Sequence, residues 1–402
     1  MKNNVFFFPV WGKKYIENFS KYSLECLLRN LKSLEKKKLV GSKLEIWTLK
    51  KDVNKINKLK KIKHLRKIID VNFESIDPFL NFAKKSRLSK YLTLSILQKI
   101  MINSHSSKYD FFWFIYPDFI FSDNLIKNFF SLKKKYDAYF LPVPQLIEEF
   151  VQSDYNKNGK IFTSSSEMQK QILKYLHPIV KICDIEKTET NTPSMFMFRR
   201  NNTVAFRYYH MHPIIIRNDR QNVNLNYQIF KSLDEEMVEH LNYKNIFITK
   251  NSKFALCVSL LGQNEVALLP NVKFSFAETN KWVSLHVNKL HQFISNFTYI
   301  LNYKNEKYNK KFFEKKLNSR VSKINESLNL NSYMRYLENY SISNIGILLE
   351  NKSYYDLIHK NYYRKYFSLS KIQIKKEIIK NFISSEKSQL SKKIFEIYKK
   401  NI

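Results

Sequence analysis

The sequence predicts an α/β protein with a mainly parallel sheet flanked by helices, followed by a basic helical C-terminal region. Short apolar and aromatic runs alternate with amphipathic helical segments as far as Asn305, a pattern typical of chains that form parallel sheets. Beyond Asn305 the chain becomes rich in lysine and tyrosine and has helical spacing without a strand pattern. We therefore expect one large domain over residues 1–305 and a helical region over residues 306–402.

The first predicted strand, NVFFFPVW at residues 4–11, is followed directly by Gly12 and an amphipathic helix. The second, KLEIWTL at residues 43–49, ends at Thr48 and a polar turn. A short third strand is expected around KIIDV at residues 67–71, and residues 89–105 have the apolar spacing of a helix. Open sheets of this kind bind their ligands beyond the carboxyl ends of the strands.

The most hydrophobic strand lies in YDFFWFIYPDFIFSDN, where Pro117 and Asp118 interrupt it. Further on, SSSEMQKQILKYLHP is a predicted helix whose Ser164 and Glu167 have the spacing of a capping box. SMFMFRR and FRYYHMHPIII are predicted to be paired strands. The later strands are expected at residues 137–144, 194–200, 206–216, 245–249 and 254–261.

Basic residues outnumber acidic ones by 69 to 35, which gives a net charge of +34, and only 11 of the 69 are arginine. Lysine is a solvated point charge, whereas arginine fits the fork of a phosphate. The lysine surplus therefore has two explanations that remain open. It reflects either a genome-wide compositional bias or a preference for anionic partners such as nucleotides, phospholipid headgroups or nucleic acid.

Glycine and cysteine usage excludes several kinds of site. The five glycines are far apart, which excludes a P-loop and a GxGxxG dinucleotide fingerprint. The three cysteines, Cys26, Cys183 and Cys257, lack CxxC spacing, so we expect them to be reduced in a cytoplasmic protein. No apolar run reaches the roughly 18 residues that a membrane-spanning helix requires.

Asp118 is the first candidate for a functional residue, because it follows the most hydrophobic strand. A carboxylate in this place can hold a divalent cation or the ribose of a nucleotide. The alternative is a turn-forming aspartate after Pro117. We expect the nearby Asp123 to cap the next helix.

His210 and His212 are the second candidates. On a continuous strand they would point to the same side, with Met211 opposite. Two imidazoles on one face can share a metal or a phosphate, or they can be polar residues on a half-buried strand. Five of the eleven arginines surround the pair, which favours a diphosphate: Arg199, Arg200, Arg207, Arg217 and Arg220.

Several short elements occur in an order that resembles a group of bacterial GT-A-type glycosyltransferase-like proteins. They are FPVWGKKYIENFSKYSLECLLRNL, PDFIFSDN, YLHP, HMHPIII and SLDEE. In that group a Trp-Gly follows the first strand, a Pro-Asp precedes a short SD segment, and a His-Pro element comes later. The resemblance covers roughly residues 4–300. It implies a nucleotide-sugar donor bound over the carboxyl ends of the sheet, and often a divalent metal.

The resemblance also implies roles for individual residues. Asp118 falls where such enzymes carry an Asp-x-Asp motif, but position 120 is isoleucine, so one acid remains. A later histidine, His210 or His212, would complete the metal or diphosphate site. We assign Asp118 and His212 to a divalent cation, Mn²⁺ or Mg²⁺. We assign Asp234 and Glu235, in SLDEE, to catalysis. The alternative for these two acids is surface charge at the start of a helix. The expected donor and diphosphate contacts are Trp11, Gly12, Thr48, Asp118, His210, His212 and Arg217.

The expected function is transfer of a sugar from a nucleotide-sugar donor to a bacterial surface glycan: capsule, lipopolysaccharide or glycolipid. We expect a cytoplasmic enzyme, peripheral at the inner face of the membrane, whose basic tail binds anionic lipids where lipid-linked acceptors reside. The alternative is a non-enzymatic, basic nucleic-acid-binding protein. The chain has no helix-turn-helix, zinc-finger or RNA-recognition signature, which makes nucleic acid the weaker candidate partner.

Overall fold

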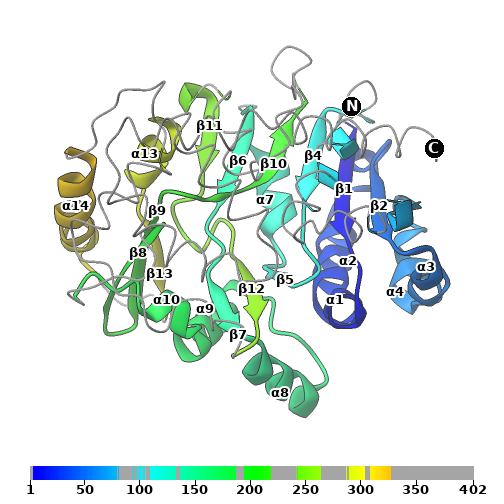
Figure 1. Ribbon diagram of the computed structural model, residues 1–402, viewed down its shortest axis with the longest axis horizontal. Coiled ribbons are helices and arrows are strands. Elements are labelled where there is room, and N and C mark those ends of the chain that lie inside the picture. Colours follow the sequence, from blue (N-terminus) through cyan, green and yellow to red (C-terminus); the bar gives the residue numbers. More distant parts are fainter. Residues whose placement is uncertain are drawn as a thin grey trace, which may run out of the picture.

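A seven-stranded sheet forms the centre of the computed structural model. The structure describes residues 3–78, 109–132, 136–186, 194–218, 243–263, 289–303 and 308–326, together with a few isolated residues between them. The strands of the sheet are β1 (Asn4–Pro9), β2 (Lys43–Thr48), β3 (Asp70–Ser75), β4 (Phe111–Phe114), β6 (Ala138–Leu141), β10 (His212–Arg217) and β11 (Ile246–Ile248). They lie in the order β11-β6-β10-β4-β1-β2-β3 (Figure 1). Only β10 runs antiparallel to its neighbours, β4 and β6. The predicted α/β class with a mainly parallel sheet is confirmed.

Aromatic side chains of β1 pack on both faces of this sheet. Phe6 contacts Trp113 on β4, with ring centroids 5.2 Å apart, and Phe7 contacts Trp47 on β2 at 5.6 Å. Every residue of β1 is buried. A strand buried on both faces reads as a continuous apolar run, which is why the pattern in the sequence identified it.

Helices follow the strands and cover the sheet. They are α1 (Lys13–Asn18), α2 (Leu24–Lys32), α3 (Lys50–Asn57), α4 (Lys60–Leu65), α7 (Leu125–Ser131), α8 (Glu148–Asn158), α9 (Ser165–Tyr175), α10 (Pro178–Lys181), α13 (Lys289–Ser295) and α14 (Lys310–Glu326), with a π-helical turn η1 (Phe19–Ser23) and 3-10 turns η2 (Lys36–Lys38) and η3 (Tyr243–Asn245). Phe8 packs on Phe19 of η1, and Trp113 packs on Phe129 of α7. Phe8 and Trp113 point to the same side of the sheet, so η1 and α7 cover one face. Among the described helices, none is long and apolar enough to cross a membrane.

Two smaller sheets complete the described fold. One contains β5 (Phe119–Phe121), β12 (Cys257–Leu261) and β7 (Gln145–Ile147), and the other contains β13 (Tyr299–Asn302), β9 (Thr203–Tyr208) and β8 (Met195–Arg200). Helix α14 packs on β8 and β9, where Phe313 and Leu317 meet Phe196 and Phe198 in a second apolar cluster. The first helix beyond Asn305 is therefore anchored by apolar contacts and not by charge. The chain beyond residue 326 lies outside the described residues.

Three local predictions need correction. The third strand, β3, begins at Asp70, so it overlaps the predicted residues 67–71 only at their end. The strand expected over residues 206–216 is two strands, β9 and β10, which belong to different sheets. Its first half does pair with β8, as predicted. Asp123 is not the helix cap, because Asn124 holds that position and Asp123 accepts a hydrogen bond from Arg29 at 2.9 Å.

Ser164 caps the start of α9, and its partner is Glu167 as predicted, although the Glu167 carboxylate bonds to the Ser164 hydroxyl and not to its backbone N–H. The Oγ of Ser164 accepts a hydrogen bond from the backbone N–H of Glu167 at 3.3 Å and donates to its Oε2 at 2.5 Å. We expect Ser164→Ala to lower the free energy of unfolding by about 1 kcal/mol, because it leaves a backbone donor unpaired. Urea unfolding measures this, with Ser166→Ala as the matched control. Equal losses in the two variants would contradict the capping role.

Candidate functional site

The carboxyl edge of the large sheet gathers the ends of β1, β2 and β4, because these strands are parallel. In the sheet, β2 and β3 lie on one side of β1, whereas β4 pairs with the other side of β1. The strand order therefore reverses between β1 and β4. In open α/β sheets this switch point is where ligands bind. Residues 10–12 and 115–118 follow the two strands at this position.

The turn that carries Asp118 is fixed by its backbone. The carbonyl of Tyr116 accepts a hydrogen bond from the N–H of Phe119 at 3.1 Å. Pro117 accepts one from the hydroxyl of Ser23 on η1 at 3.2 Å. The carbonyl of Asp118 accepts one from the N–H of Leu260 on β12 at 3.0 Å. Three successive carbonyls are thus held by different elements, which fixes the backbone at Asp118, whose side chain is half-buried.

His212 lies beside the same turn. Its Nε2 is 3.1 Å from the carbonyl oxygen of Phe114, the last residue of β4, and its ring packs on Tyr116 at 4.9 Å and Phe119 at 5.6 Å. A carbonyl only accepts, so the proton of this hydrogen bond is on Nε2 and the ring orientation is fixed. The structure therefore brings His212 to the turn that holds Asp118.

His210 lies elsewhere, contrary to the expected pairing. The chain bends between β9 and β10, and the ring of His210 packs on His291 of α13, with centroids 4.3 Å apart. The alternation rule applies within one strand, and here two strands of different sheets meet at the bend. His210 and His212 consequently do not share a face.

Arg217 and Thr48 also require correction. Arg217 ends β10 and pairs with Phe111, the first residue of β4, and its guanidinium is 3.6 Å from Asp137. It lies at the amino edge of the sheet, so it cannot share a diphosphate with Asp118. Thr48 does end β2 at the carboxyl edge, but its side chain is completely buried. As the structure stands, Thr48 packs in the core and does not face a ligand.

The turn after β1 is built on a glycine. Gly12 has a φ of +85°, which other residues adopt only with strain, and its carbonyl accepts the first hydrogen bond of α1, from Ile16 at 3.0 Å. Trp11, next to it, is half-buried. Both predicted residues therefore lie at the switch point. The predicted catalytic residues Asp234 and Glu235 lie outside the described residues.

Lys14 and Glu148 are candidates that were not predicted. Lys14 of α1 forms an ion pair of 2.8 Å with Glu148, the first residue of α8, and the Nδ2 of Asn18 donates to the same carboxylate at 2.9 Å. One signal was present in the sequence. Lys13 and Lys14 occupy the first turn of a helix, where the macrodipole favours acidic residues. Lysines in the first turn of a helix are favourable only where an anion lies nearby, and for Lys14 that anion is Glu148.

The fit of a divalent cation can be tested on these residues. Within the described ranges, no group of three or more His, Cys, Asp or Glu side chains is arranged to hold a metal. Asp118 and His212 supply two donors at most. Catalytic zinc sites use three protein ligands, whereas Mg²⁺ is often held by one or two carboxylates together with substrate phosphates. The described residues therefore do not form a complete metal site of their own.

Comparison with known proteins adds little to this geometry. No protein-family model matches the sequence, and no curated protein matches it. Among solved structures, the chain is similar to the crystal structure of mouse xyloside xylosyltransferase 1 in its apo form, with a TM-score of 0.25 and 11% identity. The similarity covers 39% of this chain and 59% of that one. A functional assignment depends on the residues at the carboxyl edge.

Proposed function

We propose that the protein is a glycosyltransferase that takes a sugar from a nucleotide-sugar donor bound at the carboxyl ends of β1 and β4. The observation that carries this proposal is the meeting of the Asp118 turn and His212 at the end of β4, next to the turn at Gly12. Nucleotides bind at such switch points in other open α/β sheets. Because the chain has no glycine-rich phosphate loop, we expect side chains to contribute to phosphate binding. The resemblance of the sequence to GT-A-type proteins supports the sugar donor.

Each of the site residues has a role in the proposed sugar transfer. Transfer breaks the bond between the anomeric carbon and the diphosphate, so negative charge develops on the departing oxygen. Because the Nε2–H of His212 is bonded to Phe114, its ring can donate a hydrogen bond to that oxygen from Nδ1 when it is an imidazolium, and Lys14, oriented by Glu148, can supply further positive charge. Asp118 can accept a hydrogen bond from a ribose hydroxyl, or hold a divalent cation that also binds the diphosphate. Asp234 and Glu235 remain the predicted bases for the acceptor hydroxyl.

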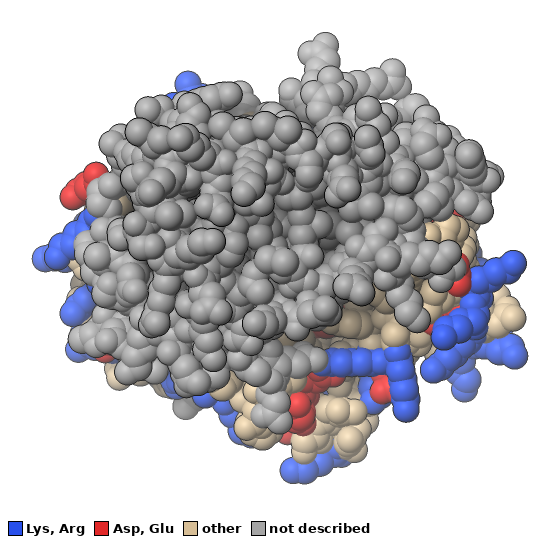
Figure 2. Space-filling model, in the orientation of Figure 1, with Lys and Arg blue, Asp and Glu red and all other residues tan. Residues whose placement is uncertain are grey.

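The proposed acceptor is a bacterial surface glycan that is free or linked to a lipid at the cytoplasmic face of the membrane. Basic side chains gather on the side of the molecule formed by α3 and α4 (Figure 2), which carry Lys50, Lys51, Lys55, Lys60, Lys61 and Lys63. A concentrated basic surface attracts anionic lipid headgroups, and the attraction weakens as salt increases. This surface supports a peripheral membrane location for the proposed enzyme.

Thermal shift with a panel of nucleotides tests the donor. We expect one nucleoside diphosphate and its sugar conjugates to raise Tm, since a ligand at 100 times its Kd stabilises the folded state by about 2.7 kcal/mol. Asp118→Asn should remove the shift. Asp123→Asn is the matched control, because that aspartate is similarly half-buried but forms a surface ion pair with Arg29.

The same panel separates the nucleic-acid-binding alternative. A single-stranded oligonucleotide at equal phosphate concentration should give no specific shift. If the oligonucleotide binds with a steep salt dependence while no nucleotide or nucleotide sugar changes Tm, the proposed function is wrong.

A further inference from the structure

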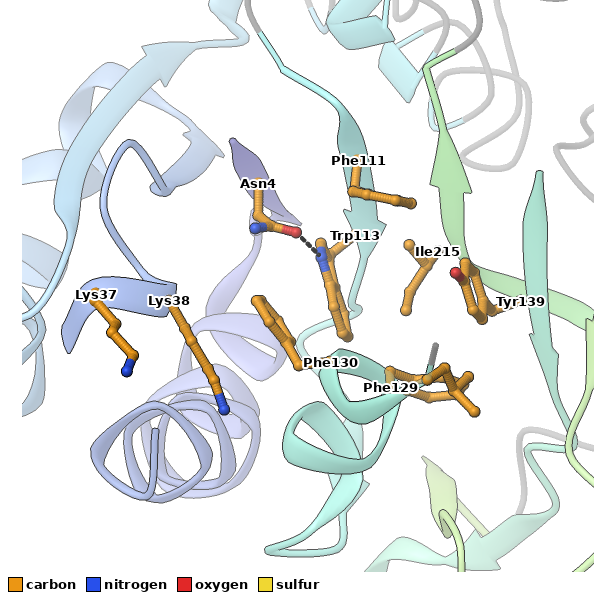
Figure 3. Close-up of a pocket in the computed structure, with 10 residues that line it drawn as sticks. Asn4, Lys37, Lys38, Phe111, Trp113, Phe129, Phe130, Tyr139 and Ile215 are labelled. Carbon is orange, nitrogen blue, oxygen red and sulfur yellow. Dashed lines mark hydrogen bonds between the residues drawn. The ribbon is translucent and has the colours of Figure 1, made fainter. Parts of the chain in front are cut away.

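A cavity lies at the amino ends of β1 and β4, at the opposite edge of the sheet from the Asp118 turn. It has a volume of about 420 Å³ and lies between the sheet and α7 (Figure 3). Interiors of folded proteins contain few voids larger than a water molecule, and functional pockets have volumes of roughly 300–1,000 Å³. Asp118 and His212 do not line this cavity. It is therefore a separate feature from the proposed donor site.

The walls of the cavity are aromatic and aliphatic. Trp113, Ile215 and Tyr139 lie side by side on β4, β10 and β6, because Ile215 pairs with both of the others in the strand register. They form the floor. Phe129 and Phe130 of α7 form the opposite wall, and Phe130 stacks on Trp113 with ring centroids 5.9 Å apart. These surfaces offer dispersion contacts and little else.

Most polar side-chain atoms of the apolar walls are already occupied. The indole N–H of Trp113 donates to Asn4 Oδ1 at 3.0 Å, and Asn4 Nδ2 donates to Ser42 at 3.5 Å. The hydroxyl of Tyr139 accepts from the backbone N–H of Tyr136 at 3.1 Å. A sugar or a nucleobase would bring several donors and acceptors into a pocket that has few polar groups left to pair with them, which costs binding energy. Apolar cavities of this kind bind apolar ligands.

Positive charge lies on one side of the mouth. Lys37 and Lys38 of η2 line the pocket opposite Tyr139 and Ile215 (Figure 3), and Lys36 precedes them. Glu35 is the nearby acid, at 2.8 Å from Lys37 and 3.5 Å from Lys38, and it balances only one of the three lysines. The entrance therefore keeps a net positive charge. An apolar interior with a cationic rim is complementary to a molecule with an apolar chain and an anionic head.

We propose that this cavity binds the chain of a single-chain amphiphile whose phosphate or similar anionic head meets Lys37 and Lys38. The proposal is independent of the proposed function, because it rests on different residues at the opposite edge of the sheet. It gives the protein a lipid-binding site that does not depend on the basic tail.

Calorimetric titration with monododecyl phosphate, below the concentration at which it forms micelles, tests this site. We expect saturable binding of about one molecule per chain with a negative change in heat capacity, the marker of buried apolar surface. Dodecanol should bind more weakly, and inorganic phosphate should not bind detectably. Leu132→Trp, at the half-buried rim after α7, should block the cavity and abolish binding.

The exposed lysines provide a variant that leaves the fold intact. Lys37→Gln combined with Lys38→Gln should weaken binding of dodecyl phosphate severalfold and leave binding of dodecanol unchanged. The control, Lys51→Gln with Lys55→Gln, removes two exposed lysines from α3 and should have no effect. Equal affinity of the wild type and the folded Leu132→Trp variant would overturn the proposal. Equal weakening by the two lysine pairs would overturn the assignment of the anionic head.

Discussion

Replacing His212 with glutamine is expected to lower turnover by about a hundredfold or more, the usual cost of losing one fixed group that stabilises charge in a transition state. Glutamine can still donate to the carbonyl of Phe114, which His212 reaches at 3.1 Å, so the fold should be retained. What is lost is the imidazole beside the Asp118 turn. The assay follows release of the nucleoside diphosphate from the donor that gives the largest thermal shift, next to a melting curve of the same sample.

His210→Gln is the matched control for this experiment. The ring of His210 packs on His291, away from the turn, so its replacement should affect Tm and leave turnover of the folded protein unchanged. Asp118→Asn should behave like His212→Gln. If both histidine variants keep normal turnover, or if both lose it only as far as they lose stability, His212 is a packing residue and the proposed site is wrong.

The parts of the fold that the sequence predicts are those determined by nearby residues. β1, β2 and β4 are buried on both faces, so apolar runs identify them. The capping box of α9 needs only Ser164 and Glu167, three positions apart. Asp118 was predicted at a strand end because Pro117 interrupts the aromatic run, and the turn is where the structure has it.

The errors arise where the path of the chain depends on distant contacts. His210 and His212 were placed on one face because a continuous strand was assumed, whereas β9 pairs with β13 and β10 pairs with β4. Arg217 was predicted to join them because five arginines lie around the two histidines in the sequence. Because β10 runs antiparallel, its last residue reaches the amino edge. β10 also has a bulge between Pro213 and Ile215, next to the proline whose missing N–H interrupts the ladder.

Long-range ion pairs were also beyond prediction. Lys14 and Glu148 come from different helices, and their contact requires α8 to begin beside α1. Thr48 shows the reverse case. Its position at the end of β2 was predicted correctly, but its burial depends on neighbours that the pattern of β2 does not specify. Strand ends thus indicate where a site lies, while the residues that face the ligand depend on the packing around it.

A buried carboxylate in β2 gives the second large effect. Glu45 is completely buried, 2.7 Å from the Nε2 of His105 and 2.8 Å from the Nζ of Lys43, and it accepts a hydrogen bond from Trp47 at 3.2 Å. Burial acts to raise the pKa of its carboxyl, but the hydrogen bonds and charges of His105 and Lys43 outweigh burial, and the pKa is lowered. On β3, burial and the charge of Glu45 raise the pKa of Glu74, which pairs with Trp47 in the strand register.

Glu45→Gln is expected to lower the free energy of unfolding by about 3 kcal/mol at pH 7, because removing one partner of a buried pair leaves the other charges uncompensated. The pKa of Glu45 is lower in the folded than in the unfolded protein, so its contribution is full above the unfolded value of about 4.3 and decreases as pH falls toward the folded value. The wild type should therefore lose more stability than the variant as pH falls from about 5 to about 3. Urea unfolding at several pH values measures the difference, with Glu35→Gln, an exposed ion-paired glutamate, as the control. A difference between wild type and Glu45→Gln that stays constant down to pH 3 would show that the carboxylate is held by packing alone and not by its charge.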